Sequence, residues 1–226
     1  MRLRSSHWAL IAAAALAAGL LVLVVTQLLL PSIAAQRLRE RLAANGKVQS
    51  VSVSAFPAVK LLWGHADEVH VRFASAEATS ARIAELLGEA KDVDDLDISI
   101  GSLRNGSLTL RDTTIRKRGP VLWGKARLSE RVLARALPLG LRVQPVASGG
   151  GKLLIRAEAG LFGFGFAVDM LLSAESGALV LEPVNVPFGS LARLTVFSDP
   201  HVLVRGVDAR SVGGGYLLSA EGRLSD

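Results

Sequence analysis

The residue types that most often perform acid–base or metal chemistry are scarce in this chain of 226 residues, which has four histidines and no cysteine. The lack of cysteine excludes thiolate zinc sites, iron–sulfur clusters, cysteine nucleophiles and disulfide scaffolds. His65 and His70 are five positions apart, with no third ligand near them in the sequence, so we predict no metal site there. We therefore expect neither a metal nor another cofactor.

Two other patterns match known sites only in part. Asp92, Asp94, Asp95 and Asp97 form an acidic cluster, but a calcium loop needs glycine at its sixth position, where this chain has Asp97. The segment 163–165 begins like a dinucleotide-binding loop, but it lacks the third glycine and lies within a strand-like pattern. There is also no HExxH, GxSxG, Walker or SxxK motif, so we predict a protein that is not an enzyme.

Apolar side chains form a more promising pattern. Three phenylalanines recur at every second position, which places them on one face of a strand. An apolar connector, residues 56–64, joins two predicted strands, and connectors usually run over the surface. Both groups are either packed beneath a sheet or exposed for contact with lipid. The candidates for lipid contact are Phe162, Phe164, Phe166, Leu61, Leu62 and Trp63.

Positive charge is concentrated in one stretch. Residues 104–142 hold ten basic and two acidic side chains, whereas residues 31–103 and 143–226 each carry a net charge of −2. The stretch is either a solvated strand and helix face or a surface that attracts anionic phospholipid head groups. We do not expect nucleic-acid binding, because stacking aromatics are few and the chain begins with an export signal. The head-group candidates are Arg104, Arg111, Arg116, Lys117 and Arg118.

The N-terminus carries this signal. A short basic head precedes 23 uncharged residues, Trp8–Leu30, and a helix that spans a bilayer needs about 20 apolar residues. Cleavable signal peptides have shorter apolar runs, although Ser32-Ile33-Ala34 offers a cleavage pattern. We predict that residues 1–31 are a membrane anchor or signal segment and that residues 32–226 form one domain outside the cytoplasm.

The domain is expected to consist mainly of strands, because apolar and polar residues alternate along most of it. The predicted strands lie at 50–55, 69–73, 97–100, 108–111, 152–159, 163–172, 178–184, 201–212 and 216–224. Asn105-Gly106 predicts a tight hairpin. Three short helices are expected: one capped by Ser32 after a break or kink at Pro31, one from Ser80 to about Ala90, and one from Ser129 to about Leu137. The fold class is therefore α+β, dominated by antiparallel sheet.

Several short motifs occur in a characteristic order. The strand Val51–Phe56 leads into Phe56-Pro57, then Leu61–Gly64, then the strand Val69–Phe73. Further on, residues 123–134 read as a strand followed by a helix that begins at serine, and closing strands follow. Together these motifs resemble the LmeA-like phospholipid-binding family of actinobacterial cell-envelope proteins, over roughly residues 32–224. The segment 77–90 departs from that pattern, because it reads as a helix where the strand would continue.

The resemblance implies a curved, mainly antiparallel sheet wrapped around a helix, with an apolar groove for acyl chains and no catalysis. It implies binding, and an associated transfer, of membrane phospholipid at the cell envelope, with the basic stretch facing anionic head groups at the bilayer. The alternative is a structural envelope module whose core is fully packed.

Overall fold

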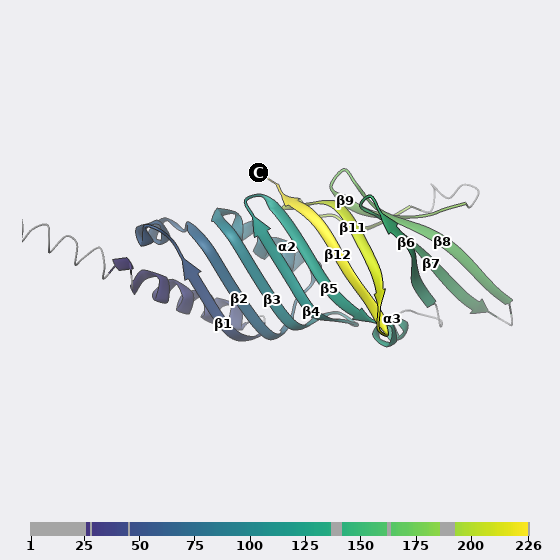
Figure 1. Cartoon of the computed structure of the whole chain (residues 1–226), viewed down its shortest axis with the longest axis horizontal. Coiled ribbons are helices and arrows are strands. Elements are labelled where there is room, and N and C mark those ends of the chain that lie inside the picture. The colour runs from purple at the N-terminus through teal and green to yellow at the C-terminus, as the bar shows by residue number, and fades with distance from the viewer. Residues whose placement is uncertain are drawn as a thin grey trace, which may run out of the picture.

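The computed structural model describes residues 26–27, 29–44, 46–136, 142–161, 164–185 and 193–225, which form two β-sheets and a small number of helices (Figure 1). The larger sheet has seven strands in the order β1-β2-β3-β4-β5-β12-β11. Its strands are β1 (Gly46–Ser54), β2 (Ala66–Glu77), β3 (Val93–Asn105), β4 (Leu108–Arg118), β5 (Val121–Ser129), β11 (Val202–Val212) and β12 (Gly215–Leu224). The α+β class with mainly antiparallel sheet is confirmed.

The smaller sheet has five strands in the order β10-β9-β8-β7-β6 and lies next to β11, the edge strand of the larger sheet (Figure 1). Its strands are β6 (Arg142–Gly149), β7 (Lys152–Leu161), β8 (Phe164–Glu175), β9 (Ala178–Pro183) and β10 (Leu194–Phe197). The helix α3 (Glu130–Ala136) precedes β6. All pairings in this sheet are antiparallel.

The inner face of the seven-stranded sheet carries the main core. Alternation places Val69, Val71 and Phe73 of β2 on this face, opposite Leu96 and Ile100 of β3, and all five are buried. The N-terminal helix, which ends at residue 43, and the helix α2 (Ser80–Glu89) pack their apolar stripes on the same core. The stripe residues in contact with it are Ala34, Ala35, Leu38 and Leu42 from the N-terminal helix, and Ile83, Ala84 and Leu87 from α2.

The predicted helix near residues 80–90 is confirmed as α2 (Ser80–Glu89), followed by the short 3₁₀ helix η2 (Ala90–Asp92). Thr79, rather than Ser80, is the N-cap, since its hydroxyl accepts a hydrogen bond from the Arg82 N–H at 3.2 Å. This helix carries the chain across one face of the sheet, so β2 and β3 pair in parallel. The strand expected here from the resemblance is thus replaced by a helical crossover.

The N-terminal helix does not end at Pro31, and the prediction that Ser32 caps a new helix is wrong. Residues 29–43 are continuously helical, and the Ser32 hydroxyl donates a hydrogen bond to the Leu29 carbonyl at 2.8 Å. Packing of Leu38 and Leu42 on the sheet overrides the local preference of proline. No helix within the described residues is both long and apolar enough to span a bilayer. The greater part of the predicted anchor, Trp8–Leu30, lies outside the described residues.

Within the described residues, a cluster of buried and partly buried apolar side chains lies between the seven-stranded sheet and the two helices. The groove expected there stays a prediction. An exposed apolar surface lies on the five-stranded sheet, as described next.

Candidate functional site

The apolar face of the five-stranded sheet is covered at one end and open at the other. Leu172, Met170, Val168 and Phe166 occupy every second position of β8 and therefore share one face. Leu172 and Met170 are half-buried, whereas Val168 is 36% exposed and Phe166 is 49% exposed. Exposure thus rises along the strand, away from the rest of the molecule. We call these four residues the β8 stripe.

Neighbouring strands widen the stripe. Leu153, Ile155 and Ala157 of β7 pair with Leu172, Met170 and Val168, and Leu181 of β9 pairs with Leu172. Because directly paired residues of adjacent strands point to the same side, the stripe and its partners form one apolar surface across three strands. An exposed apolar surface of this kind is a candidate binding surface.

The opposite face of the same sheet carries charged and amide side chains beside the apolar pair Leu154 and Leu171. Arg156 of β7 donates two hydrogen bonds to the carboxylate of Asp169 on β8, at 2.7 and 2.9 Å. This ion pair lowers the pKa of Asp169 and raises the pKa of Arg156. Gln144 of β6 donates to Glu158 at 3.4 Å on the same side. The two faces therefore differ, because the β8 stripe and its paired residues include no charged side chain.

Strand β11 covers the inner end of the apolar face. Val207 and Ala209 of β11 are buried against Leu153, with Ile155 and Leu172 packed around them. Two turns of the five-stranded sheet fasten this junction: the Val207 N–H donates to the Gly151 carbonyl at 3.0 Å, and the Val204 N–H donates to the Gly177 carbonyl at 2.8 Å. The junction holds the sheet in place and leaves its outer half uncovered by β11.

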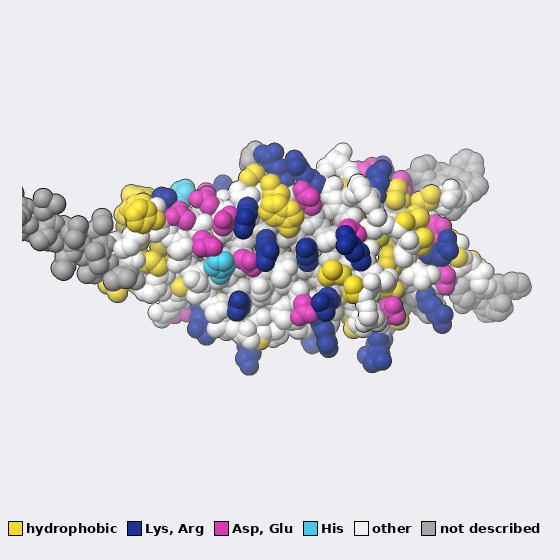
Figure 2. All heavy atoms as spheres, in the orientation of Figure 1, with side chains coloured by type: hydrophobic (Ala, Val, Ile, Leu, Met, Phe, Trp, Pro, Cys, Tyr) yellow, Lys and Arg dark blue, Asp and Glu magenta, His cyan; other side chains and the backbone are white. Residues whose placement is uncertain are grey.

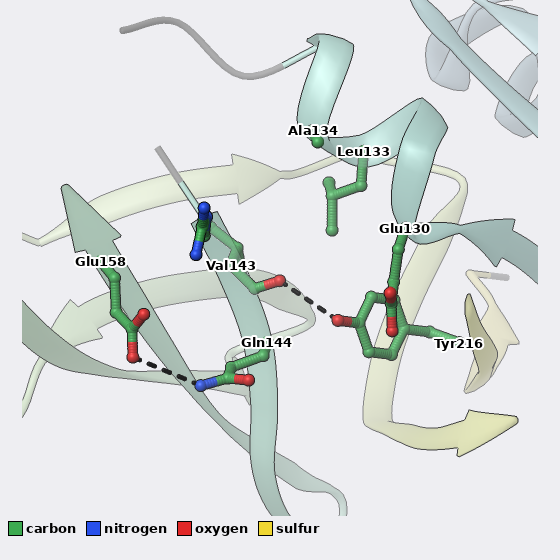
Figure 3. A pocket seen from close by; sticks show the side chains of 8 residues that line it. Glu130, Leu133, Ala134, Val143, Gln144, Glu158 and Tyr216 are labelled. Atoms are coloured by element: carbon green, nitrogen blue, oxygen red, sulfur yellow. Dashed lines mark hydrogen bonds between the residues drawn. The ribbon is translucent and has the colours of Figure 1, made fainter. Parts of the chain in front are cut away.

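A pocket of about 390 Å³ lies at the edge of this sheet, between α3, β6 and the start of β12 (Figure 3). Leu133 and Val143 line its apolar part, and the Tyr216 hydroxyl donates to the Val143 carbonyl at 3.5 Å. Burial, with a smaller contribution from Glu130, raises the pKa of Tyr216. The charged lining consists of Glu130, Glu158 and Arg142. Two carboxylates against one guanidinium make this pocket unsuited to an anionic head group.

The apolar candidates fall at two ends of the molecule. Phe166 belongs to the β8 stripe, whereas Phe162 and the side chain of Phe164 lie outside the described residues. Leu61, Leu62 and Trp63 form part of the 3₁₀ helix η1 (Ala58–Trp63) between β1 and β2. Leu61 packs partly on the core, while Leu62 and Trp63 are 65% and 70% exposed. The two groups of candidates therefore do not form one site.

Four of the five head-group candidates are exposed, but acidic residues stand among them. Arg116 pairs with Asp97 at 3.2 Å, and Arg104 approaches Glu77 at 4.0 Å. Arg111 and Arg118 are also exposed. Figure 2 shows basic and acidic side chains interspersed over the outer face of the seven-stranded sheet. The folded sheet thus brings the basic stretch beside acidic β3 and weakens its net field.

Lys117 differs from the other four because it is buried, with 2% of its surface exposed. It pairs with Leu96 on one side and Leu122 on the other, both of which face the core. Its ammonium donates hydrogen bonds to the carbonyls of Lys91 and Val93, and burial lowers its pKa. Lys117 therefore has a structural role and is not available to a head group.

The three histidines among the described residues each have a local partner. His70 contacts Glu68 at 2.8 Å, His201 contacts Asp199 at 3.1 Å, and the His65 ring lies 3.1 Å from the Trp63 carbonyl oxygen. Within the described ranges, no three or more histidine, aspartate or glutamate residues are grouped so that they could hold a metal ion.

The sequence analysis missed most of the open apolar face. Val168, Met170 and Leu172 continue the alternation that Phe166 begins, so the period of two was the signal that could have found them. The sequence also predicts the neighbouring strand β7. Whether the apolar face is exposed, however, depends on the distance over which β11 packs against it. No local pattern encodes that distance.

Comparison with known proteins gives one family. A family model described as LmeA-like phospholipid-binding matches residues 24–199, which is more than half of the chain. Neither the curated proteins nor the solved structures gave a match.

Proposed function

Because this chain belongs to the LmeA-like phospholipid-binding family, we propose that it binds the acyl chains of phospholipids on the open apolar face of its five-stranded sheet. Binding occurs without catalysis. The observation that carries the proposal is the rise in exposure along the β8 stripe, from half-buried Leu172 to Phe166 at 49%. An apolar face that is buried at one end and exposed to solvent at the other supports the binding of an apolar ligand.

The dimensions of the stripe suit an acyl chain. From Phe166 to Leu172 there are six residue steps, or about 20 Å at roughly 3.3 Å per residue. One leaflet of a bilayer has a hydrocarbon thickness of about 15 Å, half of the full core. Each buried methylene contributes about 0.8 kcal/mol, so an acyl chain that covers the exposed half of the stripe gains substantial binding energy. Because the face is open along one end, lipid is able to enter and leave sideways, which supports transfer as well as storage.

The exposed arginines of β3 and β4 are proposed to interact with anionic head groups of the membrane surface, since they lie apart from the β8 stripe. Arg111 and Arg118 add to Arg104 and Arg116, and a basic residue near an anionic surface contributes about 1 kcal/mol. The neighbouring acidic residues oppose this attraction, so we expect a modest preference. Binding to vesicles with and without anionic lipid, at low and high salt, measures it; equal binding in all four conditions contradicts it.

The proposed location is the outer side of the cell membrane, at the cell envelope. Residues 8–30 hold the domain there as an anchor, or direct its secretion if the leader is cleaved. The uncharged run of 23 residues supports this location.

A second function, a structural module of the envelope, is favoured by one observation: a cluster of buried apolar side chains lies under the seven-stranded sheet. This alternative requires that the β8 stripe carry no lipid. The two functions therefore differ in a single measurable quantity, the phospholipid bound to the purified chain.

The test is native mass spectrometry of the full chain with a matched pair of variants. Val168 and Val212 both lie in strands and have similar exposure, 36% and 39%, but only Val168 belongs to the β8 stripe. We expect Val168→Asp to lose most of the bound phospholipid, at least tenfold, because a carboxylate in the apolar face must be desolvated. Val212→Asp should retain it. A wild-type chain that repeatedly carries no phospholipid supports the structural module instead.

A further inference from the structure

A second apolar surface lies at the opposite end of the molecule from the β8 stripe. Phe56, Leu62 and Trp63 are 75%, 65% and 70% exposed, the highest values among the large apolar side chains of the described residues. All three lie in the connection between β1 and β2, on or beside η1. We call them the aromatic tip.

The backbone of the aromatic tip is held firmly. The carboxylate of Asp67, at the start of β2, accepts hydrogen bonds from the Phe56 N–H at 2.5 Å and from the Lys60 ammonium at 3.0 Å. These two bonds lower the pKa of Asp67, so it remains ionised at neutral pH. Gly64 ends η1 with φ of +80°, a conformation that favours glycine. The connection therefore presents its exposed side chains from a fixed backbone.

The start of the N-terminal helix is tied to the same connection. The side-chain amide of Gln27 donates to the Ala55 carbonyl at 3.2 Å and accepts from the Ala58 N–H at 2.8 Å. These contacts span 28 and 31 positions in the sequence and bracket the Phe56-Pro57 bond. The aromatic tip thus lies beside Gln27, which belongs to the last residues of the uncharged run Trp8–Leu30.

We infer that the aromatic tip inserts into the interfacial layer of the bilayer that holds the N-terminal segment. This inference rests on the proposed membrane location, but not on lipid binding by the five-stranded sheet. Tryptophan and other aromatic side chains favour the interface between hydrocarbon and water. Lys60, whose ammonium donates to Asp67 at 3.0 Å and whose side chain is 43% exposed, adds positive charge to the same connection. The domain is then oriented with β1 at the membrane and the β8 stripe farthest from it.

The test uses tryptophan fluorescence of the full chain in vesicles whose phospholipids carry bromine on the acyl chains. The chain has three tryptophans, at positions 8, 63 and 123. One variant, Trp8→Phe with Trp123→Phe, reports on Trp63. The control, Trp8→Phe with Trp63→Phe, reports on Trp123, which lies on the polar outer face of the seven-stranded sheet and is 39% exposed.

We expect Trp63 to emit at shorter wavelength in vesicles and to be quenched at least threefold more than Trp123. Equal, weak quenching of the two residues overturns the inference. That result would mean that the aromatic tip stays in water or binds a protein rather than the bilayer. Adding Val168→Asp to the variant that keeps only Trp63 (Trp8→Phe with Trp123→Phe) separates the two proposals. Loss of bound phospholipid with unchanged quenching supports both, whereas loss of quenching contradicts the independence of the two surfaces.

Discussion

Lys117 pairs with Leu96 and Leu122 in the neighbouring strands, so its side chain belongs to the apolar face of the seven-stranded sheet. It donates to the carbonyls of Lys91 and Val93, where η2 ends and β3 begins. Cations are favoured near carbonyls that a helix leaves unpaired at its C-terminal end. Lys117 therefore fastens the helical crossover to the middle of the sheet, and its value to the protein is structural.

Two substitutions of Lys117 separate the contribution of its packing to stability from the contribution of its charge. We expect Lys117→Ala to lower the free energy of unfolding by about 2–3 kcal/mol, because it leaves a cavity and removes the partner of two carbonyls. Lys117→Met keeps most of the volume and should cost about 1 kcal/mol or less. Urea unfolding measures both, with exposed Arg118→Met as the control, expected within about 0.5 kcal/mol of wild type. A larger loss for Met than for Ala contradicts this role.

The lowered pKa of Lys117 also predicts a pH dependence. In the unfolded chain the group titrates near 10.5, and burial places the folded value below this. Between the two values the unfolded state binds more protons, so the contribution of Lys117 to stability rises with pH up to 10.5. The difference in unfolding free energy between wild type and Lys117→Met should therefore grow in favour of wild type over that window. A difference independent of pH is the opposing result.

At the scale of single residues, the sequence indicates which charged side chains are exposed better than it indicates their ion-pair partners. Period-two alternation places Arg116 and Arg118 on one face and Lys117 on the other, so its burial could have been inferred from β4 alone. The acidic neighbours could not, because Asp97 meets Arg116 only through the pairing of β3 with β4. A net charge counted along the chain does not contain this information.

The junction between the two sheets depends on a close approach of two backbones. A Cβ atom on Gly206 of β11 would lie 2.9 Å from the Cα atom of Gly151, in the turn between β6 and β7. Gly151 itself has φ of +76°. Since neither atom belongs to a flexible side chain, one strand must move to admit even a methyl group.

Gly206→Ala should therefore destabilise the junction by about 1–3 kcal/mol, the usual cost of overpacking. The matched control is Gly124→Ala in β5, where no atom lies within 4 Å of the added Cβ. That change should be neutral or stabilise by about 0.4–1 kcal/mol through the unfolded chain. Thermal unfolding compares the two, and equal effects would show that the approach of Gly206 to Gly151 is not tight.

The elements that were predicted are those with clear alternation or a clear helical stripe. The Asn105-Gly106 hairpin between β3 and β4 is an example, with Gly106 at φ of +58°. The strands β6 and β10 were not expected. Both lie at the edges of the five-stranded sheet and contain bulges, and Pro145 interrupts β6. Edge strands with bulges lose the period that identifies a strand in sequence.

At the scale of the whole molecule, the two apolar surfaces lie at opposite ends. The aromatic tip is joined to the N-terminal helix through Gln27, and the β8 stripe lies beyond β11 at the far end (Figure 1). In the proposed function, this arrangement combines attachment to the membrane at one end with lipid binding at the other. From the sequence, both groups of residues were predicted as one set of lipid contacts. Their separation could not be predicted, because it follows from the order of the strands in the two described sheets.

The most direct test of lipid binding on the five-stranded sheet is to map where a phospholipid lies on the full chain. A phospholipid with a photoreactive diazirine on its acyl chain, bound and then irradiated, forms covalent adducts that peptide mass spectrometry locates. The account predicts adducts concentrated in Lys152–Leu161 and Phe164–Glu175, and their loss in Val168→Asp but not in Val212→Asp. Adducts confined to Ala58–Trp63 and the N-terminal segment, with none on β7 or β8, would contradict it.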